Sequence, residues 1–96
     1  MPKVHELKIN RKIYPNIVHG DKNFEIIKDN ADIKVFDFIR FVCVNDYGYD
    51  SGKSVVKRIS YIYRNDNKEL ENGYMIIGFN ALNHFDQEQL SEVTNA

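Results

Sequence analysis

Lys22 and Glu25 stand three residues apart in "GDKNFEIIKDN", residues 20–30, and their side chains could act on one ligand. A lysine brings a compact positive charge to a phosphate or an electron-rich base edge, and a glutamate accepts hydrogen bonds from an exocyclic amine or a ribose hydroxyl. The pair could also catalyse a hydrolysis, with Glu25 as general base for water beside Lys22. The remaining alternative is a surface ion pair, which contributes little.

The local backbone decides whether the two side chains can meet. Residues three apart along a strand point to opposite faces, so a shared groove requires a turn or a bulge near Lys22. Gly20 and Asn23 favour such an irregularity. The segment "NFEIIK" that follows, residues 23–28, is expected to form a strand.

A strand and a short helix are predicted before this segment. "VHELKI", residues 4–9, alternates polar and apolar residues as a half-buried strand does. Asn10 can then cap a helix that ends near His19, because Gly20 supplies the stop. Pro15 limits this helix and costs least in its first turn.

Three further strands are predicted, and polar connections separate them: "FIRFVCV" (38–44), which is almost wholly apolar and should be central, "SVVKRISYIY" (54–63) and "YMIIGF" (74–79). Five strands with one or two short helices predict an α+β fold that is mainly β. So small a sheet is expected to close into a barrel of about five to six strands, which buries both its apolar face and its edges.

The chain of 96 residues is expected to form one domain, with a core over about residues 4–80. The tail, residues 81–96, carries Leu82, Phe85 and Leu90, so it docks as a short helix or frays.

The charge balance excludes one broad class of function. A net charge of −1 argues against general coating of nucleic-acid phosphates, which needs many lysines and arginines. Residues 1–28 nevertheless carry an excess of positive charge, and the chain from Arg64 onward is acidic. The excess permits a local anionic ligand near the N-terminal half, with ordinary surface charge as the alternative.

Cysteine and histidine usage predicts neither a metal nor a cofactor. Cys43 is the only cysteine, so a disulfide or a thiolate zinc site cannot form within the chain. His5, His19 and His84 are too scattered for a metal site. The start "MPKVHELKIN" lacks the apolar run of a signal peptide, and no segment is long enough to span a bilayer. These features predict a cytoplasmic protein with no membrane partner.

The run Gly20–Ile27 resembles the G-x-K-x-x-E-x-R signature of the ASCH family, in the PUA-like superfamily. Matches in the same order are "HELKI", Lys34, Val35 and Asp37 of "KV-x-D", a Y-x-G loop at 47–52, and "NGYMIIGF". Together they resemble small single-domain bacterial and phage members over about residues 4–80. The resemblance implies a PUA-like β-barrel with a helix after the first strand and a groove for RNA or a nucleotide-like ligand. The candidate ligand-binding residues are His5, Lys8, Gly20, Lys22, Glu25, Lys28, Tyr47, Tyr49 and Tyr74.

The chain departs from this pattern at three positions. Ile27 stands where the signature has arginine, and Ala31 occupies a second position that is usually basic. Losing two guanidiniums removes the groups best suited to bidentate phosphate recognition. Phe36 replaces a glycine before the aspartate, so either the turn changes or the ring covers the groove. The groove is therefore weaker than in relatives, repurposed or inactive.

Some single-domain ASCH proteins are amidohydrolases that act on acetylated cytidine, with a lysine and a threonine nucleophile three residues later. Lys22 matches that lysine, but Glu25 occupies the threonine position. A carboxylate cannot replace the hydroxyl without a change of chemistry, so hydrolysis of a modified nucleoside is the less favoured alternative.

Exposed aromatic rings are the second requirement for gripping a single strand. Tyr47 and Tyr49 in "YGYDSGK" are the better candidates, whereas Tyr61 and Tyr63 are assigned to core packing because their strand must bury one face. Three hypotheses remain: a PUA-like module that binds RNA or a nucleotide-like ligand, an amide hydrolase in the same groove, and a phage-type accessory protein that binds a host protein.

Overall fold

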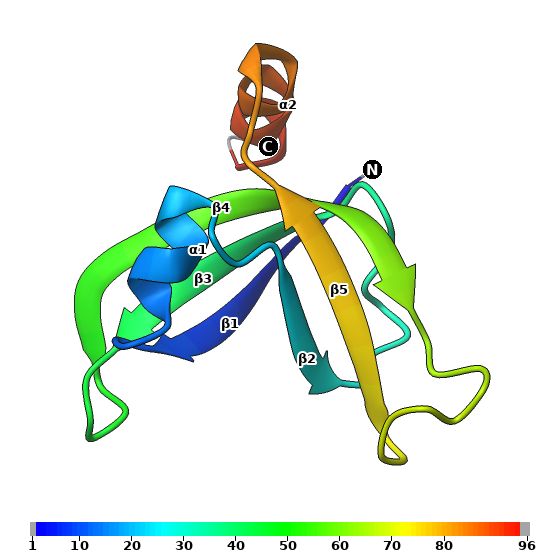
Figure 1. Cartoon of the computed structure of the whole chain (residues 1–96). Helices are drawn as coiled ribbons and strands as arrows, with labels where there is room; N and C mark the ends of the chain where they lie inside the picture. The colour runs from blue at the N-terminus through cyan, green and yellow to red at the C-terminus, as the bar shows by residue number, and fades with distance from the viewer. Residues whose placement is uncertain (1, 95–96) are drawn as a thin grey trace.

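The computed structural model describes residues 2–94 and contains five strands and two helices (Figure 1). Their order is β1 (Val4–Asn10), α1 (Tyr14–His19), β2 (Phe24–Lys28), β3 (Phe38–Val44), β4 (Asp50–Tyr63), β5 (Tyr74–Asn80) and α2 (His84–Thr94). The predicted strands and the early helix are all present. The prediction of a mainly β, α+β fold is confirmed.

The strands form one mixed sheet in the order β1-β3-β4-β5-β2. β1 runs parallel to β3, and the other neighbouring pairs are antiparallel. The sheet curves strongly, so that its two edge strands lie on the same side of the molecule (Figure 1). Within the described residues β1 and β2 form no ladder with each other. The sheet is not closed, and the predicted barrel is therefore not confirmed.

The boundaries of α1 follow from its proline and its glycine. Pro15 lies in the first turn, where its missing N–H costs nothing, and Gly20 ends the helix with φ at 86°. Asn10 does not cap this helix. Its side chain accepts a hydrogen bond from the Lys12 amide within a turn, so α1 begins only at Tyr14. The predicted cap at Asn10 was wrong for this reason, whereas the irregular early part that Pro15 allowed for is present as turns at residues 11–13.

β4 begins at Asp50, four residues earlier than the predicted start at Ser54. The turn before it is tight because the side chain of Asn45 accepts hydrogen bonds from the amides of Tyr47 and Tyr49. The strand can therefore begin within the segment that was expected to be a loop.

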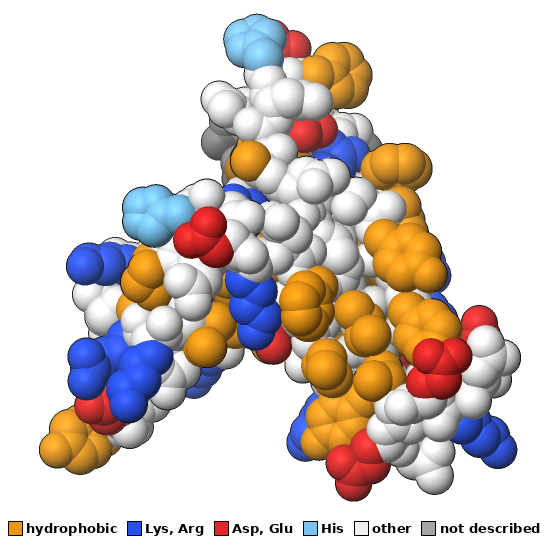
Figure 2. Space-filling view, viewed as in Figure 1, with side chains coloured by type: hydrophobic (Ala, Val, Ile, Leu, Met, Phe, Trp, Pro, Cys, Tyr) orange, Lys and Arg blue, Asp and Glu red, His pale blue; other side chains and the backbone are white. Residues whose placement is uncertain are grey.

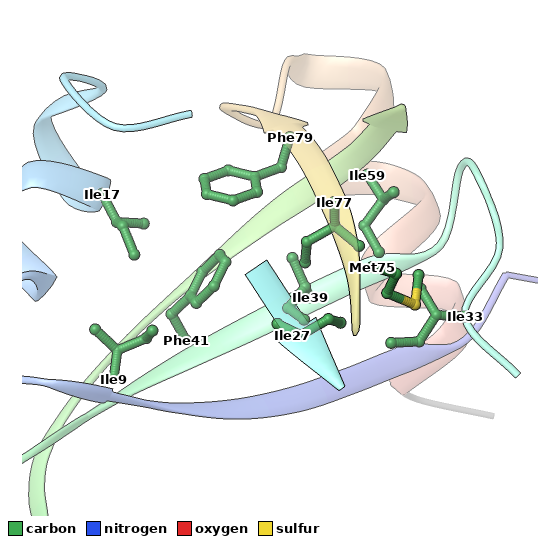
Figure 3. Packing of buried hydrophobic residues seen from close by; sticks show 10 residues of the cluster. All are labelled: Ile9, Ile17, Ile27, Ile33, Ile39, Phe41, Ile59, Met75, Ile77 and Phe79. Carbon is green, nitrogen blue, oxygen red and sulfur yellow. The ribbon is translucent and has the colours of Figure 1, made fainter. Parts of the chain in front are cut away.

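The core fills the concave side of the sheet (Figure 3). Ile17 of α1 is fully buried against it, and Ile33 reaches it from the segment between β2 and β3. The rings of Phe41 and Phe79 pack with their centroids 4.8 Å apart. The apolar residues on alternate strand positions thus bury one face of the curved sheet.

The tail forms the helix α2 over residues 84–94, and none of the side chains of this helix is buried. Arg58 Nη1 lies 2.9 Å from Asp86 Oδ1, and the Arg58 guanidinium stacks 4.5 Å from the centre of the Phe38 ring. Of the three apolar tail residues, Leu82 and Leu90 are half-buried and Phe85 is exposed. Residues 95 and 96 of the predicted tail lie outside the described part of the chain.

Candidate ligand cleft between the sheet edges

A cleft of about 640 Å³ lies between the two edge strands. Five consecutive residues of β1 (His5–Ile9) and four of β2 (Glu25–Lys28) line it, together with Asn30, Ile33, Ile39 and Tyr74. Consecutive strand residues point to alternate faces, so their joint presence means that the edge of each strand faces the cleft. The cleft therefore occupies the gap that keeps the sheet from closing.

The cleft collects polar side chains from both edges over an apolar floor. Five of the nine predicted ligand residues line it: His5, Lys8, Glu25, Lys28 and Tyr74. Ile27, Ile33 and Ile39 form part of the lining and belong to the buried core cluster, which they reach from three segments of the chain (Figure 3). Such a mixture of a few polar groups and an apolar surface is typical of small-molecule sites.

His5 is held in one orientation by a buried carboxylate. Its Nε2 lies 2.7 Å from Asp37 Oδ2, and the backbone amides of Lys3 and Lys34 also donate to Asp37. Burial alone would raise the pKa of Asp37, but the hydrogen bonds from His5, Lys3 and Lys34 outweigh it and lower the pKa below its usual value. An ionised Asp37 can only accept, so in a neutral His5 the proton resides on Nε2 and Nδ1 is an acceptor. The sequence matched Asp37 to a motif but gave it no role.

Lys22 and Glu25 do come together, although only Glu25 lines the cleft. Lys22 precedes β2, and its amide donates to the Asn16 carbonyl. Its side chain therefore does not follow the alternation of side chains between the two faces of the strand. Lys22 Nζ lies 3.0 Å from Glu25 Oε2. The distance is that of an ion pair, but the angles are not those of a hydrogen bond, and within the described residues Oε2 is buried without a hydrogen-bond partner. Glu25 thus retains acceptor capacity at the wall of the cleft.

The other predicted ligand residues lie outside the cleft. Gly20 ends α1, and Tyr47 and Tyr49 are exposed in the turn between β3 and β4. That turn lies beyond the end of β1, because Val44 at the end of β3 pairs with Asn10. Tyr47 and Tyr49 therefore do not share a site with Glu25 in this structure.

The three departures from the ASCH pattern have distinct structural consequences. Ile27 packs in the core and contributes to the cleft floor, whereas Ala31 is exposed in the connection after β2. Phe36 keeps a glycine-like backbone with φ at 76°. Its ring lies 6.0 Å from the Arg58 guanidinium and does not line the cleft, so the ring leaves the cleft uncovered.

Two features of the surface and core escaped the sequence interpretation. Tyr61 is exposed on the outer face of β4, so its assignment to the core was wrong, whereas Tyr63 is half-buried.

Lys57 is only 5% exposed and has no hydrogen-bond or ion-pair partner in the described chain. It alternates with Val55 and Ile59 on the concave face, and that alternation is the signal that could have revealed it. Burial lowers the pKa of Lys57 below its usual value.

The described residues contain no cluster of three or more histidine, cysteine or acidic side chains that could hold a metal ion. Neither helix in residues 2–94 has the length and apolar character needed to cross a membrane.

The chain belongs to a family described as a domain of unknown function (DUF3850), whose model matches residues 4–79. No curated protein matches the chain. The matched segment contains all five strands up to Phe79 and the whole lining of the cleft.

Proposed function

We propose that this member of the family binds a nucleotide-like ligand, free or as one exposed nucleotide of an RNA strand, in the cleft between β1 and β2. The observation that carries the proposal is the meeting of His5 and Lys8 of β1 with Glu25 and Lys28 of β2 across the cleft, beside Tyr74 of β5. The volume of the cleft falls within the range of about 300 to 1,000 Å³ that is typical of small-ligand sites. The ASCH resemblance carries the same expectation.

Five polar side chains of the cleft have a part that suits their chemistry, and Glu6 and Asn30, which also line it, are assigned none. Lys8 and Lys28 are exposed at the rim, where their ammonium groups can meet a phosphate in contact with water. Glu25 can accept from an exocyclic amine and His5 Nδ1 from a ring N–H or a hydroxyl, while Tyr74 offers an aromatic surface. The isoleucines of the floor can pack against a base.

The rim carries lysines in place of the guanidiniums expected from the family pattern. A lysine holds phosphate as a point charge, without the paired hydrogen bonds of arginine. Binding is therefore expected to weaken steeply with added salt, because both rim charges are exposed and screened.

An amide chemical-shift titration with AMP and with adenosine tests the proposal. Shifts that cluster in residues 4–10 and 24–30 are expected, with AMP binding tighter than adenosine at low salt. Lys8→Met and Lys28→Met should remove the advantage of AMP, whereas Lys53→Met, an exposed lysine that does not line the cleft, should not. The absence of shifts at millimolar ligand for both compounds would refute the proposal.

Hydrolysis of a modified nucleoside is a second candidate, favoured by the His5–Asp37 pair at the cleft wall. His5 Nδ1 could take a proton from water as the water oxygen attacks an acetyl carbon, and the departing exocyclic amine would receive a proton. Acetate and the free nucleoside are the products. Acetylated cytidine is incubated with the protein, and chromatography measures the release of cytidine. Release that is lost in His5→Gln supports the hydrolysis hypothesis, and no release by the unaltered protein eliminates it.

A further inference from the structure

Two exposed aromatic rings flank a glycine on the outer face of the sheet. Phe24 of β2 pairs with Gly78 of β5, and Gly78 pairs with Tyr61 of β4. Phe24 is 50% exposed and Tyr61 is 60% exposed. Neighbouring strands lie about 4.8 Å apart, so the two aromatic residues start about 10 Å apart with no side chain between them.

This spacing has room for one additional ring. Stacked aromatic rings have centroids about 4.5 to 7 Å apart, so a third ring fits between two that are about 10 Å apart. In the described structure Phe24 and Tyr61 do not contact each other, and the ring pair that does form is Phe41 with Phe79 in the core. The glycine therefore leaves a slot between the two aromatic residues, on the Tyr61 side of which a Cβ at Gly78 would lie 3.4 Å from the Tyr61 Cβ.

The slot is part of a larger apolar face that reaches the cleft. The next row across the same face consists of Ile26, Ile76 and Tyr63. Ile26 also lines the cleft, so the face and the cleft meet across β2. Figure 2 shows hydrophobic side chains gathered over β2 and β5, and α2, whose Asp86 pairs with Arg58 of β4, stands away from them.

The charge beside the slot favours an anionic strand. Lys22 Nζ lies 5.6 Å from the centre of the Phe24 ring, and Lys28 stands farther along the same side of β2. Aromatic rings with lysines beside them are the combination that grips single-stranded nucleic acid, because bases stack and phosphates meet the cations.

From these observations we propose that the outer face of β2, β5 and β4 stacks the base next to the one in the cleft. The ligand is then a single-stranded oligonucleotide that passes over β2, with a base between Phe24 and Tyr61. This inference rests on the proposed binding of a nucleotide in the cleft. It also gives Lys22 a part, as the cation between the two bases.

Calorimetric titration with AMP and with a single strand of six adenylates tests the extension. Six adenylates should bind more tightly than AMP. Phe24→Ala and Tyr61→Ala should each weaken binding of the strand by about 5- to 140-fold, the range for loss of one stacked base, and leave AMP unchanged. Gly78→Val should fill the slot and have the same selective effect. Phe85→Ala on α2, another exposed aromatic residue, is the matched control and should change neither. Amide spectra of each variant check that the fold is kept.

The outcomes separate the two proposals. If AMP binds but the strand gains nothing, or the variants bind it normally, the stacking surface is wrong and the cleft stands. If neither probe binds, both proposals fail. If sedimentation shows that the unaltered protein is a dimer and that Phe24→Ala dissociates it, the face is an interface between protein chains and the inference is overturned.

Discussion

His5 Nε2 lies 2.7 Å from Asp37 Oδ2, and this contact joins the edge strand β1 to the segment that enters β3. The same carboxylate accepts hydrogen bonds from the backbone amides of Lys3 and Lys34. One buried side chain therefore joins the start of β1 to the connection that precedes β3. The position of the β1 wall depends on it.

Asp37→Ala should lower the free energy of unfolding by about 3 kcal/mol, because it leaves two backbone amides and His5 without their acceptor. Urea unfolding at pH 7 measures the change. Asp32→Ala, which removes an exposed and solvent-screened ion pair with Lys3, should lower the free energy of unfolding far less. Equal effects of the two substitutions would contradict a special role for Asp37.

The stability of the protein should fall on acidification in a window set by Asp37. The folded-state pKa of Asp37 is lowered from its usual 3.8, so the unfolded chain binds the proton more readily. The stabilisation is fully present above the usual pKa and is lost as the pH falls through the lower folded value. Urea unfolding between pH 5 and 2, values chosen at about one to two units on either side of the usual carboxyl pKa, should show a shallower fall for Asp37→Ala than for the unaltered protein.

Lys57→Met should raise the free energy of unfolding at pH 7, because Lys57 is only 5% exposed and its burial disfavours the charged form of the amine. Burial lowers the folded-state pKa of Lys57 from 10.5, so the cost is fully present below the folded value and disappears as the pH rises towards 10.5. Thermal unfolding from pH 7 upward should therefore show a gain in stability that Lys57→Met lacks. Lys53→Met, at an exposed site, should leave the gain unchanged.

The Lys22–Glu25 pair should couple by about 1 kcal/mol in a double-mutant cycle of Lys22→Met and Glu25→Gln. The two side chains are 26% and 19% exposed, so solvent screening is only partial. Urea unfolding of the four proteins gives the coupling. A value of zero would mean that the pair adds nothing to folding, and both groups would then be available to a ligand.

Asp86→Ala should loosen α2 by about 2 kcal/mol and leave the sheet intact. Asp86 pairs with Arg58, and it exchanges hydrogen bonds with Asn83 directly before the helix. Amide hydrogen exchange should accelerate in residues 84–94 and not in β3 or β4. Glu88→Ala, whose exposed side chain pairs only with His84, is the control.

The sequence by itself determined the strands, the early helix and the mainly β class. Alternation in "VHELKI" and the apolar run "FIRFVCV" are local signals of burial, and Pro15 and Gly20 act through their own backbone conformations. The resemblance to the ASCH family also pointed to residues such as Lys8, Glu25 and Tyr74, which the structure brings to one cleft.

Only the tertiary structure decided which edges meet and which faces remain exposed. β1 pairs with β3, a strand that lies 34 residues later in the chain, as the pairing of Val4 with Phe38 shows. β1 therefore stands at one edge of the sheet and β2 at the other, and the gap lies between them. The slot between Phe24 and Tyr61 depends on pairings of both residues with Gly78, and Lys57 is buried on the strand position that pairs with Ile39 of β3. Such contacts join residues far apart in the chain, and no local pattern of residues encodes them.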